Sequence, residues 1–249
     1  MRQSTSTETT PITRETTLSA IALRSDAHAT ILDRHKLDFC CRGGRSLQEA
    51  CRASGLDVDR VLAELSSGSA ARQTVGDADA DWQGRTPGEL IDHIVSVHHT
   101  YTRAVLARLT PLVAKVTGKH ADRHPELARV AAAFDELAED MEPHMMKEER
   151  VLFPYIRALA SPSGAAPAPF GTVGNPVRMM MRDHDRAAAL LAEITAATAD
   201  YSPPADACNS FRALYAGLAE LRLDLMKHVS LENNVLFPTA IALEGKQTC

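Results

Sequence analysis

Apolar residues recur along most of the chain at the three- and four-residue spacing of amphipathic helices, and stretches that alternate as strands do are scarce. From about residue 17 to residue 66 this spacing comes in short runs, with breaks at Gly43, Gly44 and Gly55. This part of the chain therefore predicts a small helical N-terminal domain.

Four longer helical stretches follow. The first opens at Thr86, with a proline next and a glutamate three residues on, a combination that starts helices. It should run to about residue 113, unless Pro111 ends or kinks it earlier. The others begin near residues 125, 176 and 205. Joined by modest loops and alternating in direction, they predict an all-α fold with an antiparallel up-down four-helix bundle over residues 86–243.

The remaining segments lack an apolar period. Residues 1–16 are rich in Ser and Thr and predict a disordered tail, and residues 67–85 are rich in Gly, Ser, Ala and Asp and predict a linker. Residues 244–249 predict a second tail. The expected organisation is a helical domain over residues 17–66, joined by the linker to the bundle over residues 86–243.

Composition narrows the class of function. The 249 residues carry a net charge of -5, and Lys and Arg are spread along helical faces, which argues against a nucleic-acid surface. No apolar run reaches the roughly 18 residues that span a bilayer, and the N-terminus lacks the architecture of a signal peptide. The odd number of cysteines argues against a disulfide framework. We therefore expect a cytoplasmic protein that binds neither nucleic acid nor membrane.

One stretch of sequence occurs twice. HMMKEERVLFP, from residue 144, returns as HVSLENNVLFP, so that His144 and Glu148 correspond to His228 and Glu232, 84 residues later. Residues four apart lie on one face of a helix, so each copy offers an imidazole and a carboxylate that point the same way. A single such pair is most simply a solvated ion pair, but duplicated pairs on facing helices are how metal sites in bundle cores are built. We expect both copies to bind metal.

The other two bundle helices supply single histidines. His98 and His99 lie on opposite edges of the apolar stripe of the first helix, and periodicity alone does not choose between them, whereas His93 lies on a different face. A lone histidine such as His184, in the third helix, is usually a core residue. It lies 85 residues after His99, nearly the offset of the repeat, which favours a ligand. The expected set is four imidazoles and two carboxylates.

This donor set favours iron. If each of two ions takes two imidazoles and both carboxylates bridge the ions, each ion keeps one or two open positions, which suits iron best, with manganese or zinc as weaker alternatives. A ferritin-like site would need Glu-x-x-His on two helices instead. We therefore predict two iron ions, bridged by oxo or hydroxo when oxidised. Pro143, just before His144, predicts a kink or a local widening of its helix.

A second candidate lies in the N-terminal domain. Cys40 and Cys41 are adjacent, between a predicted helix and a Gly-Gly turn, and Arg42 and Arg45 beside them would favour a thiolate. Burial as ordinary core residues is the competing interpretation. As a functional pair, they predict redox exchange or metal contact, because a disulfide between adjacent cysteines is strained.

These motifs resemble a known family. LIDHIVSVHH, HMMKEERVLFP, MRDHD and HVSLENNVLFP are similar to the hemerythrin-like domain of the repair of iron centres family, the ScdA/YtfE/NorA group. DFCCRGG followed by SLQEAC resembles the short N-terminal domain of that family, and the resemblance covers about residues 18 to 243. His120 matches a further family histidine near the site, and His93 is expected to be structural. The metal ligands that the resemblance implies, with His99 in place of His98, are His99, His144, Glu148, His184, His228 and Glu232.

The resemblance also implies a function. It is that of a cytoplasmic di-iron protein of nitrosative and oxidative stress, which binds or reduces nitric oxide and supports repair of damaged iron–sulfur clusters, with iron–sulfur proteins or a scaffold as partners. Cys40 and Cys41 would then relay iron or electrons. Two alternatives stay open: a protein that binds nitric oxide or dioxygen without turnover, and a redox sensor that signals to a protein partner. We expect a monomer or a homodimer, with Cys249 and the N-terminal tail available for oligomer contacts.

Overall fold

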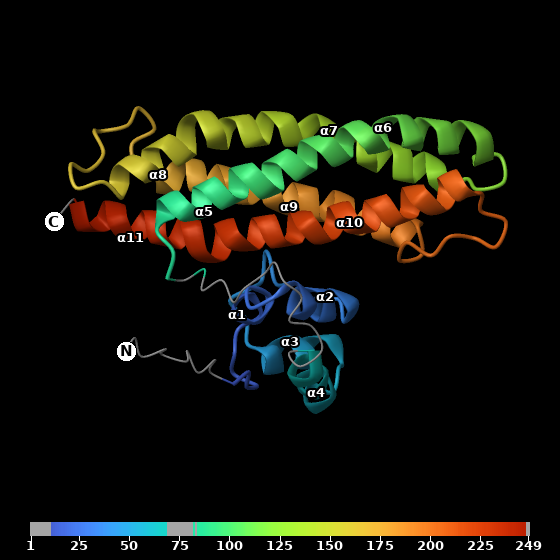
Figure 1. Ribbon diagram of the computed structural model, residues 1–249, viewed down its shortest axis with the longest axis horizontal. Coiled ribbons are helices and arrows are strands. Elements are labelled where there is room, and N and C mark those ends of the chain that lie inside the picture. The colour runs from blue at the N-terminus through green and yellow to red at the C-terminus, as the bar shows by residue number, and fades with distance from the viewer. Residues whose placement is uncertain (1–10, 69–81, 83, 248–249) are drawn as a thin grey trace, which may run out of the picture. The chain divides into compact units, whose positions relative to one another are not determined.

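The computed structural model describes residues 11–68, 82 and 84–247, which fall into two compact units that divide between Asp81 and Trp82. The named elements of the described residues are all helices, with no strand among them, so the predicted all-α class is confirmed (Figure 1). None of the helices in these ranges is both long and apolar enough to cross a membrane. Most of the predicted linker, the first ten residues of the predicted tail and Cys249 lie outside the described residues.

The N-terminal unit consists of short helices whose ends follow local signals. The hydroxyls of Thr17, Ser25 and Ser46 accept backbone N–H bonds at the starts of three of them, and Gly55, at a φ of 68°, ends the third. Leu18, Leu47 and other apolar residues of the unit are fully buried. The helices are α1 (Leu18–Ala22), α2 (Asp26–Arg34), α3 (Leu47–Ser54) and α4 (Val58–Gly68).

The predicted N-terminal tail, residues 1–16, extends too far along the chain. The backbone N–H groups of Leu47 and Gln48 donate to the carbonyls of Thr16 and Arg14, both at 2.9 Å, and the Arg14 guanidinium lies 2.6 Å from a carboxylate oxygen of Asp59. The N–H groups at the start of a helix have no partner within the helix, so the turn before α1 supplies acceptors for α3. Residues 14–16 therefore belong to the helical unit.

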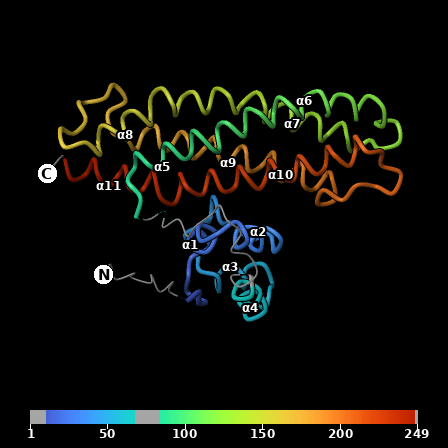
Figure 2. Tube along the Cα trace, viewed as in Figure 1, coloured from blue at the N-terminus to red at the C-terminus, as the bar shows by residue number. Residues whose placement is uncertain are grey.

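The C-terminal unit is the predicted four-helix bundle, built within the described residues from four long rods that lie side by side and alternate in direction (Figures 1 and 2). Each rod except the third contains a short π-helical segment, labelled η. The first rod is α5 (Pro87–His93), η1 (Ile94–His99) and α6 (Thr100–His120), and the second is α7 (Glu126–Lys147), η2 (Glu148–Leu152) and α8 (Phe153–Leu159). The third is α9 (Gly174–Ala197), and the fourth is α10 (Asn209–Leu231), η3 (Glu232–Leu236) and α11 (Phe237–Gln247).

Two predicted helix ends differ from the structure. Pro111 lies within α6, which runs on to His120, because this proline is exposed and the carbonyl that loses its N–H partner can face water. The last rod continues to Gln247, beyond the predicted start of the tail at residue 244. The carboxylate of Glu244 accepts the backbone N–H of Val173 and the hydroxyl of Tyr155, each at 2.9 Å, which fixes α11 to the loop before α9 and to α8.

One apolar cluster fills the part of the bundle formed by α6, α7, α9 and α10. It includes the fully buried residues Leu109, Phe134, Leu137 and Leu221, which follow the helical spacing seen in the sequence. A Cβ at Gly217 would come within 2.7 Å of the Leu109 side chain, so α6 and α10 approach closely there. This apolar core packs the four rods together beside the polar cluster that lies further along them.

The predicted widening of the helix occurs, but not at Pro143, which lies within regular α7. The second rod widens at η2, where the N–H of Phe153 donates to the carbonyl of Glu148, five residues back, and η3 repeats this at the equivalent position. In both rods the next residue is the proline of the repeated Leu-Phe-Pro, whose ring crowds the carbonyl four residues earlier. The sequence has no proline between Pro87 and Pro111, so η1 has another cause. Such π turns are frequent at functional sites.

Candidate metal centre

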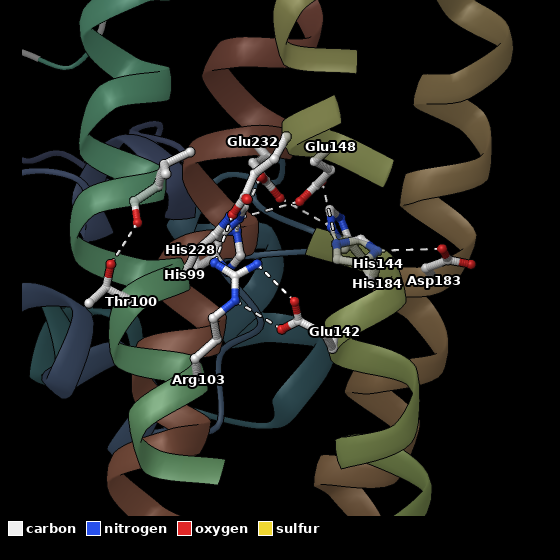
Figure 3. A network of polar contacts seen from close by, with 12 residues as sticks. His99, Thr100, Arg103, Glu142, His144, Glu148, Asp183, His184, His228 and Glu232 are labelled. Carbon is white, nitrogen blue, oxygen red and sulfur yellow. Dashed lines mark hydrogen bonds and ion pairs between the residues drawn. The ribbon is translucent and has the colours of Figure 1, made fainter. Parts of the chain in front are cut away.

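The structure brings six side chains together inside the bundle, all of them predicted ligands (Figure 3). Each is at most 4% exposed. The three π segments help to place them, because His99 ends η1 while Glu148 and Glu232 begin η2 and η3. Three more come from the regular helices: His144 from α7, His184 from α9 and His228 from α10.

The six residues form two sets that share their carboxylates. In the first set, one ligand atom each from His99, His228 and the two glutamates lies within 4.8 Å of the others. In the second, His144 and His184 take the place of that histidine pair. The Nε2 atoms within each pair are 3.2 Å apart. Figure 3 shows the carboxylates of Glu148 and Glu232 directed toward both pairs.

Three of the imidazoles are fixed from behind through Nδ1. The Nδ1–H of His99 donates to Glu149 at 2.7 Å, and Arg103 holds that carboxylate at 2.9 Å. His144 Nδ1 lies 3.4 Å from Asp183, and His184 Nδ1 lies 3.0 Å from the amide oxygen of Asn233. Outer acceptors of this kind set the ring orientation and leave Nε2 as the metal-binding nitrogen.

This arrangement calls for a cation. Because Nδ1 of His144 and of His184 each face an acceptor, the proton of each neutral ring lies on Nδ1, and two Nε2 lone pairs point at each other across 3.2 Å. Neither carboxylate oxygen of Glu148 accepts a hydrogen bond from any described residue, although both are buried. A carboxylate buried without a hydrogen bond and lone pairs that face each other are both unfavourable, and a bound metal ion relieves both.

The electrostatics agree with a metal site. Burial, together with the neighbouring His184, lowers the pKa of His144 to about 4, so the ring is neutral as a ligand must be. Burial, and then the charge of Glu232, raises the pKa of Glu148 well above its usual value. Burial acts upward on Glu232 as well, but the imidazoles of His228 and His184 outweigh it and hold the pKa of Glu232 well below its usual value.

Three of the other histidines, those named in the sequence analysis, lie outside the six-residue cluster. His98 faces the carboxylate of Asp224, with its Nδ1 3.0 Å from Oδ1, and His93 packs between the rings of His98 and Trp82. The prediction that His120 lies near the metal ligands is wrong. It ends α6, about 30 Å along the helix from His99, and its Nε2 contacts the thiol of Cys208 at 3.4 Å.

The residues behind the imidazoles were not predicted from the sequence. Glu149 follows Glu148, Asp183 precedes His184, and Asn233 follows Glu232. The available signal in the sequence was a polar residue directly next to each of these three ligands. The local pattern does not say which of these side chains turns toward an imidazole on another rod.

The cysteine pair of the N-terminal unit is held by one aspartate. Asp38 Oδ1 accepts the backbone N–H groups of Cys40 and Cys41 at 3.2 and 2.9 Å, and the Cys40 thiol at 3.2 Å. The two sulfurs are 3.7 Å apart. Cys40 is buried, and its contact with Cys41, together with burial, raises its pKa, so the predicted thiolate is wrong for Cys40. Cys41 is half-buried.

Comparison with known proteins matches both parts of the chain. The profile of the hemerythrin HHE cation-binding domain matches residues 90–240, and that of ScdA_N, a domain of unknown function (DUF542), matches residues 14–68. Proteins named iron–sulfur cluster repair protein YtfE are similar over 93% of the chain. Those from Enterobacter sp. and Cronobacter sakazakii are 38% identical and are covered over 99% and 98% of their lengths. One from Escherichia coli is 36% identical and is covered over 99%.

Proposed function

The chain belongs to the hemerythrin family, and on that premise we propose that it is a non-haem di-iron protein of the nitrosative and oxidative stress response that supports repair of damaged iron–sulfur clusters. Its relatives over 93% of the chain are named iron–sulfur cluster repair proteins. The finer part of the proposal is that the centre binds or reduces nitric oxide, in the cytoplasm.

The observation that carries the proposal is the pair of donor sets with common carboxylates. One iron ion would be held by His99 and His228 and the other by His144 and His184, with Glu148 and Glu232 bridging them. Four protein donors leave each ion room for a small ligand, unlike a closed structural zinc site. Mixed imidazole and carboxylate donors with open positions favour iron.

The side chains of the site are arranged in a way that suits a small diatomic ligand. Bound ferrous ions would take up nitric oxide and could supply one electron each to its reduction. All six side chains are nearly or fully buried, so the site is shielded from bulk solvent. The acceptors behind His99, His144 and His184 fix three rings before metal binds. Preformed ligands of this kind lower the cost of ordering the site on binding.

We also propose that the same site carries iron as a cargo. Imidazole and carboxylate ligands hold ferrous iron less firmly than thiolates do, so transfer toward a thiolate-rich cluster is downhill. A protein that stores iron in the bundle could therefore return it to a damaged cluster. Restored activity of an enzyme with a damaged [4Fe–4S] cluster, incubated with the iron-loaded chain, tests this step. Equal restoration by an iron-loaded Glu232→Gln variant would contradict it.

Anaerobic titration of the reduced, iron-loaded protein with nitric oxide tests the gas chemistry. We expect an electron paramagnetic resonance signal of bound nitric oxide and release of nitrous oxide. His184→Gln should abolish both, whereas His124→Gln should leave them unchanged, because His124 pairs with Asp206 in the turn after α6, away from the cluster. Absence of both signals in the wild-type protein would end the enzymatic version.

Binding without turnover is the second candidate, and the state of Cys40 favours it. A buried thiol whose pKa is raised is a poor thiolate and hence a poor relay for electrons. This version predicts stable nitric oxide adducts without nitrous oxide, and the same adducts in a double variant with Cys40→Ser and Cys41→Ser. If that double variant instead loses only the nitrous oxide, the cysteine pair takes part in turnover.

A further inference from the structure

The fourth imidazole of the cluster differs from the other three. His228 Nδ1 is buried and has no hydrogen-bond partner among the described residues, while its Nε2 lies 3.1 Å from Glu232 and faces the other ligands. His99, His144 and His184 all have an acceptor at Nδ1. Among the described residues, His228 is therefore the one ligand imidazole whose Nδ1 has no hydrogen-bond acceptor.

A second buried atom without a partner lies one helical turn away. Asp224 precedes His228 by four residues on α10, so the two side chains rise from the same face of the helix. Asp224 Oδ2 is buried and, within the described ranges, accepts no hydrogen bond. The Nδ1 of His228 can donate a hydrogen bond and the Oδ2 of Asp224 can accept one, and leaving either group buried without a hydrogen bond is unfavourable.

His98 holds these two residues together. Its Nδ1 lies 3.0 Å from Asp224 Oδ1, which directs the carboxylate, and its ring stacks on that of His228 with the centroids 5.6 Å apart and the planes 5° from parallel. His98 is itself buried. A buried histidine adjacent in sequence to a predicted ligand thus contacts both the carboxylate and the unsupported imidazole.

We propose that Asp224, oriented by His98, positions His228 through one ordered water that accepts the Nδ1–H of His228 and donates to Asp224 Oδ2. Buried waters typically join polar groups of this kind that have no direct partner. The bridge places the proton of His228 on Nδ1 and directs the Nε2 lone pair at the metal, as the direct acceptors do for the other three rings. This inference rests on the proposed metal centre and concerns the ion shared by His99 and His228.

The test measures iron binding by anaerobic competition with a ferrous chelator, and records Mössbauer spectra of protein loaded with ⁵⁷Fe. Asp224→Ala should weaken one of the two ions about 10–100-fold, the usual loss when the support of a metal-binding histidine is removed. The other ion should keep its affinity, and only one iron environment in the spectrum should change. Glu220→Gln is the matched control, since Glu220 lies one turn earlier on α10, is exposed, and pairs with Arg108.

The Mössbauer spectrum distinguishes positioning of His228 by Asp224 from a purely structural role of Asp224. A carboxylate that only ties η1 to α10 would change stability when removed and leave both iron environments as they are. Asp224→Asn has nearly the same shape and keeps an acceptor for His98, so it decides the matter if Asp224→Ala fails to fold. Weakened binding of one ion in the Asn variant supports the proposal.

The outcomes also separate this inference from the proposed function. If the wild-type protein binds no iron, the metal centre itself is wrong. If it binds two ions and the Asp224 variants match it in affinity and in spectrum, the centre stands and the role of Asp224 and His98 is overturned.

Discussion

The Glu148→Gln variant should be more stable than the wild-type protein without metal and less stable than the wild-type protein with iron bound. In the metal-free fold, burial and the charge of Glu232 raise the pKa of Glu148, and neither of its oxygens accepts a hydrogen bond from the described residues. Glutamine has the same shape without the charge, and its amide can donate to the facing imidazole nitrogens. Removing a buried carboxylate that accepts no hydrogen bond should stabilise the metal-free protein by about 1–3 kcal/mol.

With iron present, the order should invert. Glu148 belongs to both donor sets, so its loss weakens both ions. A ligand that binds only the folded state stabilises it by about 2.7 kcal/mol when its free concentration is 100 times the Kd. The wild-type protein gains this stabilisation for each bound ion, and the variant loses most of it. For a bundle of this size, each kcal/mol corresponds to about 2–4 °C in Tm.

The pH dependence follows from the direction of the pKa shift. Because the folded, metal-free protein holds the Glu148 proton more tightly than the unfolded chain does, its stability falls as pH rises above the usual glutamate value of 4.5. Glu148→Gln removes this slope, so the Tm difference between variant and wild type should shrink toward acidic pH.

Thermal unfolding followed by circular dichroism measures the Tm of variant and wild type, once in a chelator and once with ferrous iron under anaerobic conditions. Glu139→Gln is the control, because Glu139 is an exposed residue of α7 whose change should stay within about 0.5 kcal/mol. A Glu148→Gln protein that is less stable than wild type in chelator, or that gains as much from iron, would refute the reasoning.

Three further predictions test other parts of the molecule. Cys208 is exposed, and the backbone N–H of Phe211 at the start of α10 lowers its pKa, whereas burial raises the pKa of Cys51. Cys208 should therefore react with iodoacetamide at neutral pH faster than Cys51. Mass spectrometry measures both rates, and equal rates would contradict the predicted difference in reactivity. Leu137→Ala, at a fully buried core position, should cost about 2–5 kcal/mol in the free energy of unfolding, measured by chemical denaturation, and a cost below about 1 kcal/mol would contradict the packing. Glu149→Gln should weaken iron binding about 10–100-fold in chelator competition because His99 loses its charged acceptor, and an unchanged affinity would show that this contact does not support the metal.

The sequence predicted the bundle and the six clustered residues for different reasons. Helical spacing of apolar residues such as Leu109 and Leu221 was enough for the rods, because a bundle core needs one apolar stripe on each helix. The repeat was enough for the two His-x-x-x-Glu pairs, since residues four apart share a face wherever the helix lies. Both patterns are local, so they can be recognised in the sequence without knowledge of the tertiary structure.

The choice between His98 and His99 depended on the family resemblance. η1 is wider than an α-helix, so the phase carried forward from the apolar stripe no longer says which face each histidine occupies. The structure buries both residues but turns only His99 toward Glu148, while His98 faces Asp224. A local change of helix type was not visible in the periodicity.

Residues that act across rods were predicted least well. His120 matched a family histidine, but sequence gives no distance, and the length of α6 carries it away from the cluster. At Cys40, the neighbouring arginines suggested a thiolate, whereas the decisive contacts are the Asp38 carboxylate, Cys41 and burial. Such contacts depend on how the backbone folds back on itself.

The most direct test of the central claim is the iron content and Mössbauer spectrum of the chain, reconstituted anaerobically with ⁵⁷Fe²⁺ and freed of loosely bound metal. We predict two iron ions per chain in nitrogen and oxygen environments, and none in a Glu148→Gln, Glu232→Gln double variant. A chain that retains at most one ion, or a double variant that retains two, would contradict the shared-carboxylate centre.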